Sequence, residues 1–405
     1  MGLLRRKKEA IERFRKENTY AIACLHCFKR FGHDMVMFRA LEALDADGYT
    51  AQYDDELDSY RYRFGLDTAG ELEAALDPAD FDESRKKYHK GILMSLTDDY
   101  GNITTKRLCP FCHNELHPSA GFSPSIIFSI AGSTRAGKSV FFTSLIHQLR
   151  NKTSKHFPSF CVPINNEVGR TFKHGLVAPM IENGILPISA LLKEFPDAPL
   201  VFSFSLTEGD SSEVHIVFFD PAGDSLCLDL HNDLMKSSSG VMMLVDPLGI
   251  PYFGRDLAEK SDPDFDPLFF TEPADDLGIM LLEHAKNIPA AVVLTKTDLL
   301  KSIIGESELF DDLSAVFEDF RHSGLFDVSE FSEIDSEISV FFEEECPHFY
   351  NAMKKRFGSD LGFFGVSALG EKPNAGQVSQ INPVRVDEPF LWLLYKMGLI
   401  MGEDE

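Results

Sequence analysis

Residues 125–149 hold the feature that most constrains this chain: an apolar run, a glycine-containing loop and an amphipathic run, in that order. The loop, residues 132–139, reads Gly-Ser-Thr-Arg-Ala-Gly-Lys-Ser and matches the pattern G-x-x-x-x-G-K-[ST]. We expect a buried strand before the loop and a helix after it, which is the context that a phosphate-binding loop requires. The alternative is a glycine-containing turn that matches by chance, and the flanking runs disfavour it.

Each residue type in this loop has a physical role in holding a nucleotide triphosphate. The two glycines permit backbone angles that other residues avoid, so consecutive N–H groups can approach a phosphate. The lysine adds a charge for the β- and γ-phosphates, and the serine, in the first helical turn, offers its hydroxyl to Mg²⁺. The phosphate-binding candidates are Gly132, Ser133, Thr134, Arg135, Ala136, Gly137, Lys138 and Ser139.

Length and charge limit the classes of function. A chain of 405 residues is long enough for a large and a small unit, and its net charge of -25 disfavours a general nucleic-acid-binding surface. Residues 1–19 are locally basic and predict a short amphipathic helix, either solvated or docked, with weak membrane-surface contact as the alternative. No apolar run approaches the roughly 18 residues of a membrane span, and the basic residues 1–17 lack the apolar core of a signal peptide. We expect a soluble cytoplasmic protein.

Four of the seven cysteines form two C-x-x-C pairs, Cys24 with Cys27 and Cys109 with Cys112. Two such turns supply a closed four-sulfur shell, which predicts a structural zinc ion. Two unrelated thiol pairs, or a redox pair, are the alternative. Nearby histidines are substitute ligands if a cysteine is out of reach: His26, His113 and His117.

The two cysteine pairs are unusually far apart. Eighty-one residues separate Cys27 from Cys109, whereas a small zinc ribbon has about 15–20. We therefore expect a module over residues 20–120 with an inserted segment, 28–108, whose role the sequence does not reveal. Within the insert we expect helical runs over 35–44 and 68–76. The nucleotide domain follows over residues 121–405.

Two segments after the loop are candidates for contact with Mg²⁺ and the γ-phosphate. Residues 152–199 should contain a first switch, for which Thr153 and Thr171 are the available threonines, and the choice stays open. Runs at 200–206 and 213–219 predict an antiparallel hairpin ending in Asp-Pro-Ala-Gly. Asp220 would hold Mg²⁺ through water, and the Gly223 N–H would meet the γ-phosphate. A turn without a ligand is the alternative.

A second acidic residue competes for the magnesium role. Asp246 follows the apolar run 240–245, a pattern that also describes the acidic strand of an ATPase. We prefer Asp220, because only it is followed by glycine at the required offset.

The base-reading candidates follow two further apolar runs, 290–294 and 361–366. Asp298 of Thr-Lys-Thr-Asp can accept hydrogen bonds from N1–H and the exocyclic amine of guanine, a donor pair that adenine lacks. The Lys296 stem can pack along the ring, and a backbone N–H after Ser367 can meet O6. A helix cap and a plain strand-end turn are the respective alternatives. The guanine-binding candidates are Thr295, Lys296, Asp298, Ser367 and Ala368.

The remaining C-terminal runs predict helices. We expect acidic helical stretches over 307–321 and 331–357, and a closing helix over 389–400 packed on the sheet.

The order of these boxes resembles the Ras-like and translation-factor class of P-loop GTPases over residues 125–405. With the cysteine pairs ahead of it, the chain also looks like bacterial "double-GTPase" type proteins of conflict and defence gene clusters. The resemblance implies an α/β fold: a mostly parallel sheet with helices on both faces and one antiparallel hairpin, preceded by a small zinc-binding module with an insertion. It also implies a switch that hydrolyses GTP to GDP with Mg²⁺, and a protein partner.

Two positions depart from that class. The guanine box usually begins with Asn, which ties it to the phosphate loop, and here it begins with Thr295. A Gln that orients the attacking water often follows the D-x-x-G box, and here Asp224 stands there. We therefore expect slow or partner-activated hydrolysis. The alternatives are a zinc-module scaffold or sensor that holds nucleotide without turnover, and a P-loop ATPase that uses Asp246.

Overall fold

The protein is described by a computed structural model of the 405-residue chain. The expected basic helix of residues 1–19 lies outside the described residues. The structure describes residues 22–41, 48–122, 125–132, 136–157, 161–163, 169–170, 172–186, 200–205, 213–219, 236–250, 288–301, 314–320, 322–374 and 376–403.

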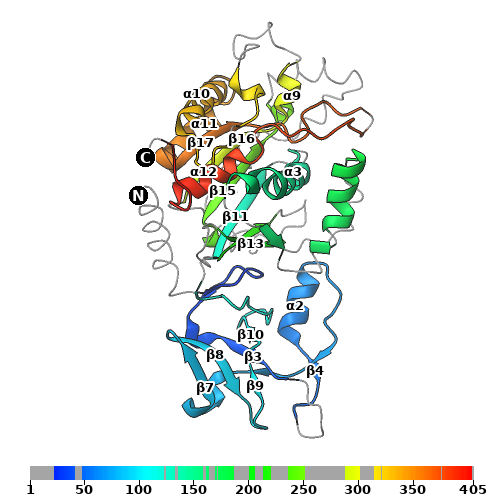
Figure 1. The fold of residues 1–405 in the computed structure, drawn as a ribbon, viewed down its shortest axis with the longest axis vertical. Helices are drawn as coiled ribbons and strands as arrows, with labels where there is room; N and C mark the ends of the chain where they lie inside the picture. Colours follow the sequence, from blue (N-terminus) through cyan, green and yellow to red (C-terminus); the bar gives the residue numbers. More distant parts are fainter. Residues whose placement is uncertain are drawn as a thin grey trace.

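A seven-stranded sheet in the order β12-β13-β14-β11-β15-β16-β17 forms the centre of the larger unit (Figure 1). Strands β14, β11, β15, β16 and β17 are parallel, while β13 pairs antiparallel with β14 and β12 antiparallel with β13. The expected mostly parallel sheet with an antiparallel hairpin is therefore confirmed. The strands are β11 Ser125–Gly132, β12 Cys161–Pro163, β13 Leu200–Ser205, β14 Glu213–Phe219, β15 Gly240–Val245, β16 Ala290–Leu294 and β17 Leu361–Gly365.

Alternate residues of the central strands enter two different cores, because successive side chains of a strand point to opposite faces. In β11, Ile126, Phe128 and Ile130 join a core with α3 (Lys138–Asn151) and α12 (Glu388–Lys396). Ile127 joins the opposite core with α10 (Val328–Glu345) and α11 (Pro347–Phe357). Both faces of these strands are covered, which explains why they read as continuous apolar runs.

The helices after β16 differ in part from the expected ones. The helical stretch predicted over 331–357 is two helices, because Pro347 begins α11 and has no N–H to continue α10. Within 314–320, the described part of the stretch predicted over 307–321, there is only a 3₁₀ turn, Ala315–Phe317. The short helix α9 spans Thr297–Leu300, and α12 confirms the expected closing helix.

Residues 22–122 carry the cysteine pairs, and their described part contains short strands, one α-helix and three 3₁₀ turns. Helix α2 has Asp54 as its N-cap, which accepts a hydrogen bond from the Leu57 N–H, with acidic residues in its first turn. The elements are β1 Ile22–Ala23, β2 Arg30–Phe31, β3 Met37–Arg39, β4 Gln52–Tyr53, α2 Asp55–Arg63, β5 Glu71–Leu72, β6 Ala75–Leu76, β7 Lys86–His89, β8 Ile92–Thr97, β9 Ile103–Thr104 and β10 Arg107–Leu108.

Both helices predicted within the insert were wrong. Met37–Arg39 of the run 35–44 is strand β3, and the run 68–76 contains β5 and β6. The reason is tertiary: β3 lies between β10 and β6 in an antiparallel sheet, so its backbone pairs with residues 107–108 far along the chain. The insert is therefore built into the module around the second cysteine pair.

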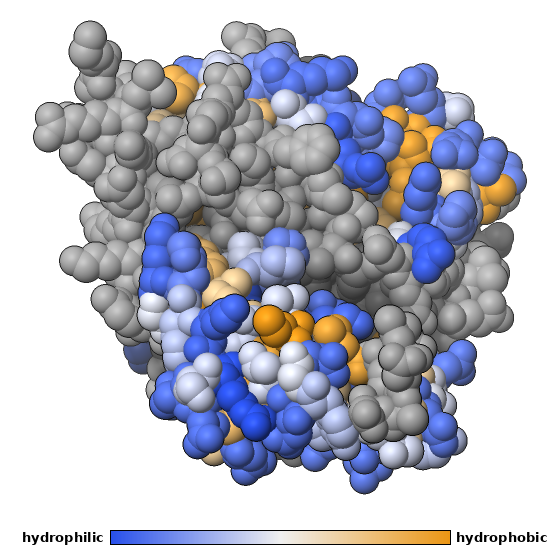
Figure 2. Space-filling view, turned by 60° about the horizontal axis from the view of Figure 1, so that its bottom comes forward, coloured by the Kyte–Doolittle hydropathy of each residue, from blue (hydrophilic) through white to orange (hydrophobic). Residues whose placement is uncertain are grey.

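The module lies at the amino end of the parallel strands (Figure 1). Arg30 donates a hydrogen bond to the carbonyl oxygen of Ser237, three residues before β15 begins, at 3.3 Å. In the described residues, the module surface that faces forward in Figure 2 is mainly hydrophilic, with small apolar areas. Within the described residues, every helix is too short or too polar to span a lipid bilayer.

Candidate functional site

The two glycines of the phosphate loop are required for different reasons. Gly132 ends β11 beside β15, and a Cβ atom there would lie 2.6 Å from the carbonyl oxygen of Leu244. Gly137 is the N-cap of α3 with a φ of 81°, in the left-handed region that glycine favours. Ser133, Thr134 and Arg135 lie outside the described residues. The loop thus leads from the sheet edge directly into a helix N-terminus.

Lys138 and Ser139 begin this helix. The Lys138 Nζ donates to the carbonyl oxygen of Gly132 at 3.2 Å, so the ammonium group lies back over the loop. Ser139 is half-buried in the first turn of α3. The positive end of the helix dipole and a lysine charge therefore coincide at one point, an arrangement that favours an anion.

The two boxes predicted to read the base lie together at the carboxyl ends of β16 and β17. The Ser367 hydroxyl donates to Oδ1 of Asp298 at 2.5 Å, and the Gly370 N–H donates to the same hydroxyl oxygen at 2.9 Å. The Thr297 N–H donates to the carbonyl of Val366 at 3.2 Å. The Ser367 bond orients the Asp298 carboxylate, which is half-buried.

Thr295 connects the base-reading boxes to the phosphate loop. Its hydroxyl lies 3.2 Å from the Ala136 carbonyl oxygen and 3.1 Å from that of Val245, both acceptors. On α3, the buried Ser144 hydroxyl donates to the Ala368 carbonyl at 2.7 Å. The predicted phosphate loop and both predicted base-reading boxes therefore lie at the same edge of the sheet.

Asp246, the second candidate for magnesium binding, bonds to Leu248 and Lys296. Its Oδ1 accepts from the Leu248 N–H at 3.0 Å, and its Oδ2 accepts from Lys296 Nζ at 2.5 Å. These contacts weigh against Asp246 as the metal ligand. Asp220, Gly223 and Asp224 lie outside the described residues, so their roles stay predictions.

The structure excludes one of the two threonines considered for the first switch. Thr153 is buried beyond the C-terminal end of α3, and its hydroxyl donates to Asp387. A helix of 14 residues is about 21 Å long, so Thr153 cannot reach a metal at Ser139. Thr171 is the remaining candidate and lies outside the described residues.

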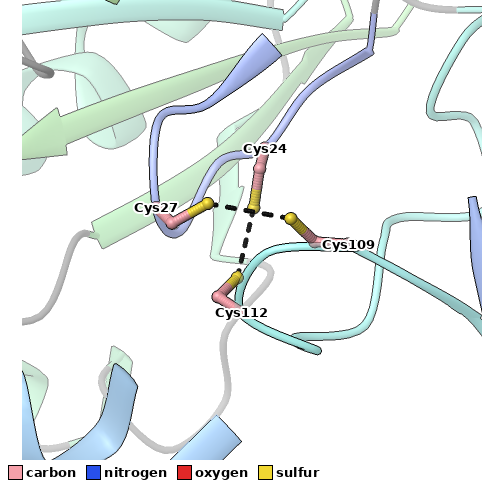
Figure 3. A group of neighbouring side chains, drawn as sticks. All are labelled: Cys24, Cys27, Cys109 and Cys112. Carbon is pink, nitrogen blue, oxygen red and sulfur yellow. Dashed lines mark hydrogen bonds between the residues drawn. The ribbon is translucent and has the colours of Figure 1, made fainter. Parts of the chain in front are cut away.

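The four predicted cysteines converge on one point from chain positions more than 80 residues apart (Figure 3). The Sγ atoms of Cys24 and Cys112 are 3.7 Å apart, as are those of Cys27 and Cys109, and all four lie within 4.8 Å of one another. Four sulfurs about 2.3 Å from a central Zn²⁺ form a tetrahedron with edges of about 3.8 Å. The cluster therefore has the dimensions of a Cys₄ zinc site.

The two cysteine turns also share one backbone pattern. Phe28 N–H donates to the Cys24 carbonyl, and His113 N–H donates to the Cys109 carbonyl, each at 3.0 Å. The second residue after the first cysteine donates its N–H to that cysteine's sulfur in both turns, at 3.4 and 3.5 Å. Phe28 and His113 both have positive φ, 65° and 47°. Such N–H groups aimed at sulfur stabilise thiolates.

The close packing of the four thiols shifts the pKa values of Cys24 and Cys27 in different directions. Burial raises the pKa of the Cys24 thiol, while hydrogen bonds from the neighbouring thiols, first Cys109, lower the pKa of Cys27. A divalent cation would allow all four sulfurs to ionise together.

None of the substitute histidines is needed for this shell. The Nδ1 atoms of His113 and His117 bond instead to Asp54 and to the Ser119 hydroxyl, and burial lowers the pKa of His26 to about 4. The Asp54 carboxylate also accepts from Arg39 at 2.6 Å, which ties α2 and β3 to the second cysteine turn.

Sequence reasoning missed three contacts of the candidate site. It did not pair Asp246 with Lys296, Ser144 with Ala368, or Asp54 with His113. Only the first had a signal, because acidic and basic residues directly after adjacent parallel strands meet at one sheet edge.

No protein-family model matches the sequence, and no curated protein matches it. Among solved structures, the chain is similar to the GTP-bound GTPase-like domain of Ski7 from S. cerevisiae, at 16% identity and a TM-score of 0.30. It is also similar to bacterial selenocysteine-specific elongation factor EF-Sec, at 16% identity and a TM-score of 0.26. Each match covers 67% of this chain, but only 50% of the first structure and 29% of the second.

Proposed function

We propose that this chain binds GTP with Mg²⁺, hydrolyses it to GDP and acts as a regulatory switch. The observation that carries the proposal is the bond from Thr295 to Ala136, which joins a base-reading box to a phosphate loop at one sheet edge. A site with both features matches a purine nucleoside triphosphate, and the Asp298 carboxylate selects guanine.

The residues divide the work of binding. The loop N–H groups and Lys138 would hold the phosphates, and Asp298 would accept from guanine N1–H and the 2-amino group. Ser139 and Asp220 would hold Mg²⁺, which neutralises charge on the phosphate oxygens when bound. The Gly223 N–H would sense the γ-phosphate. Asp224 stands where the water-orienting residue is expected, so we propose a slow intrinsic rate that a protein partner raises.

The cysteine cluster would hold a structural Zn²⁺, because its four sulfurs leave no ligand position open for chemistry. Cytoplasmic location and a role in a bacterial defence or conflict system stay predictions from the sequence and its resemblance.

Titration calorimetry with GDP and GTP tests the proposal. We expect micromolar or tighter binding by the wild type and loss of binding in Lys138→Ala. Lys155→Ala, which removes an exposed lysine beyond the far end of α3, is the control and should bind normally. Equal affinity of the wild type for ATP would contradict guanine selection and favour the ATPase alternative.

A second candidate function is a scaffold or sensor that holds GTP without turnover, and Asp224 is the residue that favours it. Phosphate release, measured with and without candidate partner proteins, distinguishes the two functions. The absence of release under every condition would support the scaffold.

A further inference from the structure

Lys296 makes an ion pair that the guanine-reading role alone does not require. Its Nζ lies 2.5 Å from Oδ2 of Asp246, on the neighbouring strand end. The Asp246 side chain is 9% exposed and the Lys296 side chain 31%. The carboxylate is therefore almost enclosed, while about a third of the lysine side chain is exposed.

The register of the sheet creates this pair. Val245 of β15 is paired with Leu294 of β16, so the chains leave the sheet side by side. Asp246 comes next on one strand and Thr295-Lys296 on the other. Lys296 has a φ of 55°, in the left-handed region that lysine rarely adopts, so its backbone is held in an uncommon conformation.

The orientation of Asp246 is itself fixed from both sides. Oδ1 accepts the Leu248 N–H, and the next residue, Pro247, begins a 3₁₀ turn with a restricted φ. The carboxylate is therefore a rigid acceptor, and the lysine is the flexible partner with four rotatable bonds. Of the two side chains, Asp246 is therefore the more rigid one.

We propose that Asp246 is a positioning residue, which anchors the Lys296 ammonium so that the lysine stem forms a fixed apolar platform for the base. The inference rests on the proposed guanine-nucleotide site. A stem held at both ends loses less rotamer freedom when a ring packs on it, so the anchored lysine binds the ring more tightly than a free one.

This role predicts a distinct pattern of ligand selectivity. A stem that packs on the ring face does not contact the 2-amino group, which Asp298 reads. Loss of the anchor should therefore weaken guanine and hypoxanthine nucleotides by the same factor, because the two bases differ only in that amino group. A direct role of Asp246 in reading the 2-amino group would change the ratio between the two affinities, and a role in metal binding would make the loss depend on Mg²⁺.

The experiment measures GDP and IDP affinity by titration calorimetry for Asp246→Asn, Lys296→Met and the double variant. We expect each single variant to bind both nucleotides about tenfold more weakly, with an unchanged GDP-to-IDP ratio. The double variant should be no weaker than either single one, because both remove the same interaction. Asp246→Glu should recover part of the loss.

Asp360→Asn is the matched control, since it removes a carboxylate paired with Lys396 at the opposite end of β17. It should bind GDP normally. Should Asp246→Asn unfold in a thermal melt, Lys296→Met carries the test alone, because it leaves the Asp246 turn intact.

Three results would overturn the inference while leaving the proposed function intact: wild-type affinity in Asp246→Asn, additive losses in the double variant, or a loss that disappears when Mg²⁺ is omitted. If the wild type itself fails to bind GDP, the proposed function fails and the inference falls with it.

Discussion

The Thr295 hydroxyl lies 3.2 Å from the Ala136 carbonyl oxygen, which links the residue after β16 to the loop that follows β11. These residues are separated by 159 positions in the chain. A threonine hydroxyl has one proton and, in this geometry, two acceptors, Ala136 and Val245. Thr295 therefore connects the residue after β16 with the loop that follows β11.

Thr295→Val should weaken nucleotide binding without unfolding the protein. Valine keeps the shape of threonine but removes the donor, so the Ala136 carbonyl loses its partner and the loop becomes less ordered. We expect GDP affinity to fall about fivefold, measured by titration calorimetry. Ser336→Ala, which removes an exposed helical hydroxyl, is the control. Unchanged affinity would mean that the bond is incidental to binding.

Asp298→Asn should change which base is bound. Xanthine carries an oxygen where guanine has the 2-amino group, and the amide of the substituted side chain can donate to that oxygen. The amide oxygen can still accept from Ser367, so local structure should persist. In competition experiments we expect XDP to displace GDP from the variant and not from the wild type. A variant that still prefers GDP would remove Asp298 from the base-reading role.

Cys109→Ser should lower both the zinc content and the stability of the module. The serine cannot offer a thiolate to the four-sulfur shell, and the energy of structural zinc binding is folding energy. Mass spectrometry of the native protein and urea unfolding are the measurements. Cys346→Ala is the matched control, because it removes a buried thiol outside the cluster. Equal zinc content in both variants would refute the metal site.

Arg385→Met should be among the most destabilising single substitutions. Arg385 is fully buried and donates to Glu388, also buried, at 2.7 and 2.8 Å. Its removal leaves a buried carboxylate without its partner, at a cost of about 3–5 kcal/mol in unfolding free energy. Arg385→Met combined with Glu388→Gln should recover part of this loss in urea unfolding. If Arg385→Met is as stable as the wild type, the buried ion pair between Arg385 and Glu388 does not stabilise the fold.

Asp335→Asn should change how stability depends on pH. Burial raises the pKa of Asp335, despite the hydrogen bond it accepts from the Phe363 N–H. A carboxyl group with a raised folded-state pKa stabilises the fold below its unfolded pKa, near 3.9, and this stability is lost as the pH rises through the folded pKa. Asparagine keeps the acceptor and does not titrate. The variant should therefore gain stability relative to the wild type between pH 4 and pH 7 in urea unfolding. A difference in unfolding free energy between variant and wild type that does not change with pH would contradict the raised pKa of Asp335.

The sequence alone determined the central sheet and the set of residues around the candidate site. The runs predicted over 213–219, 240–245 and 290–294 match β14, β15 and β16. Strands β15 and β16 were easy to recognise because strands covered on both faces are apolar without interruption. The phosphate loop and the cysteine pairs were readable because their chemistry demands particular residues at short, fixed spacings.

Tertiary structure decided every feature that depends on distant residues meeting. Met37–Arg39 forms a strand because it pairs with β10, which lies about 70 residues further along the chain. Lys296 meets Asp246 because β15 and β16 are neighbours in register. The four cysteines likewise meet only when the chain folds, because a long insert separates the two pairs in the sequence. Local pattern carries no record of such pairings, since their free energy arises only when the chain has folded.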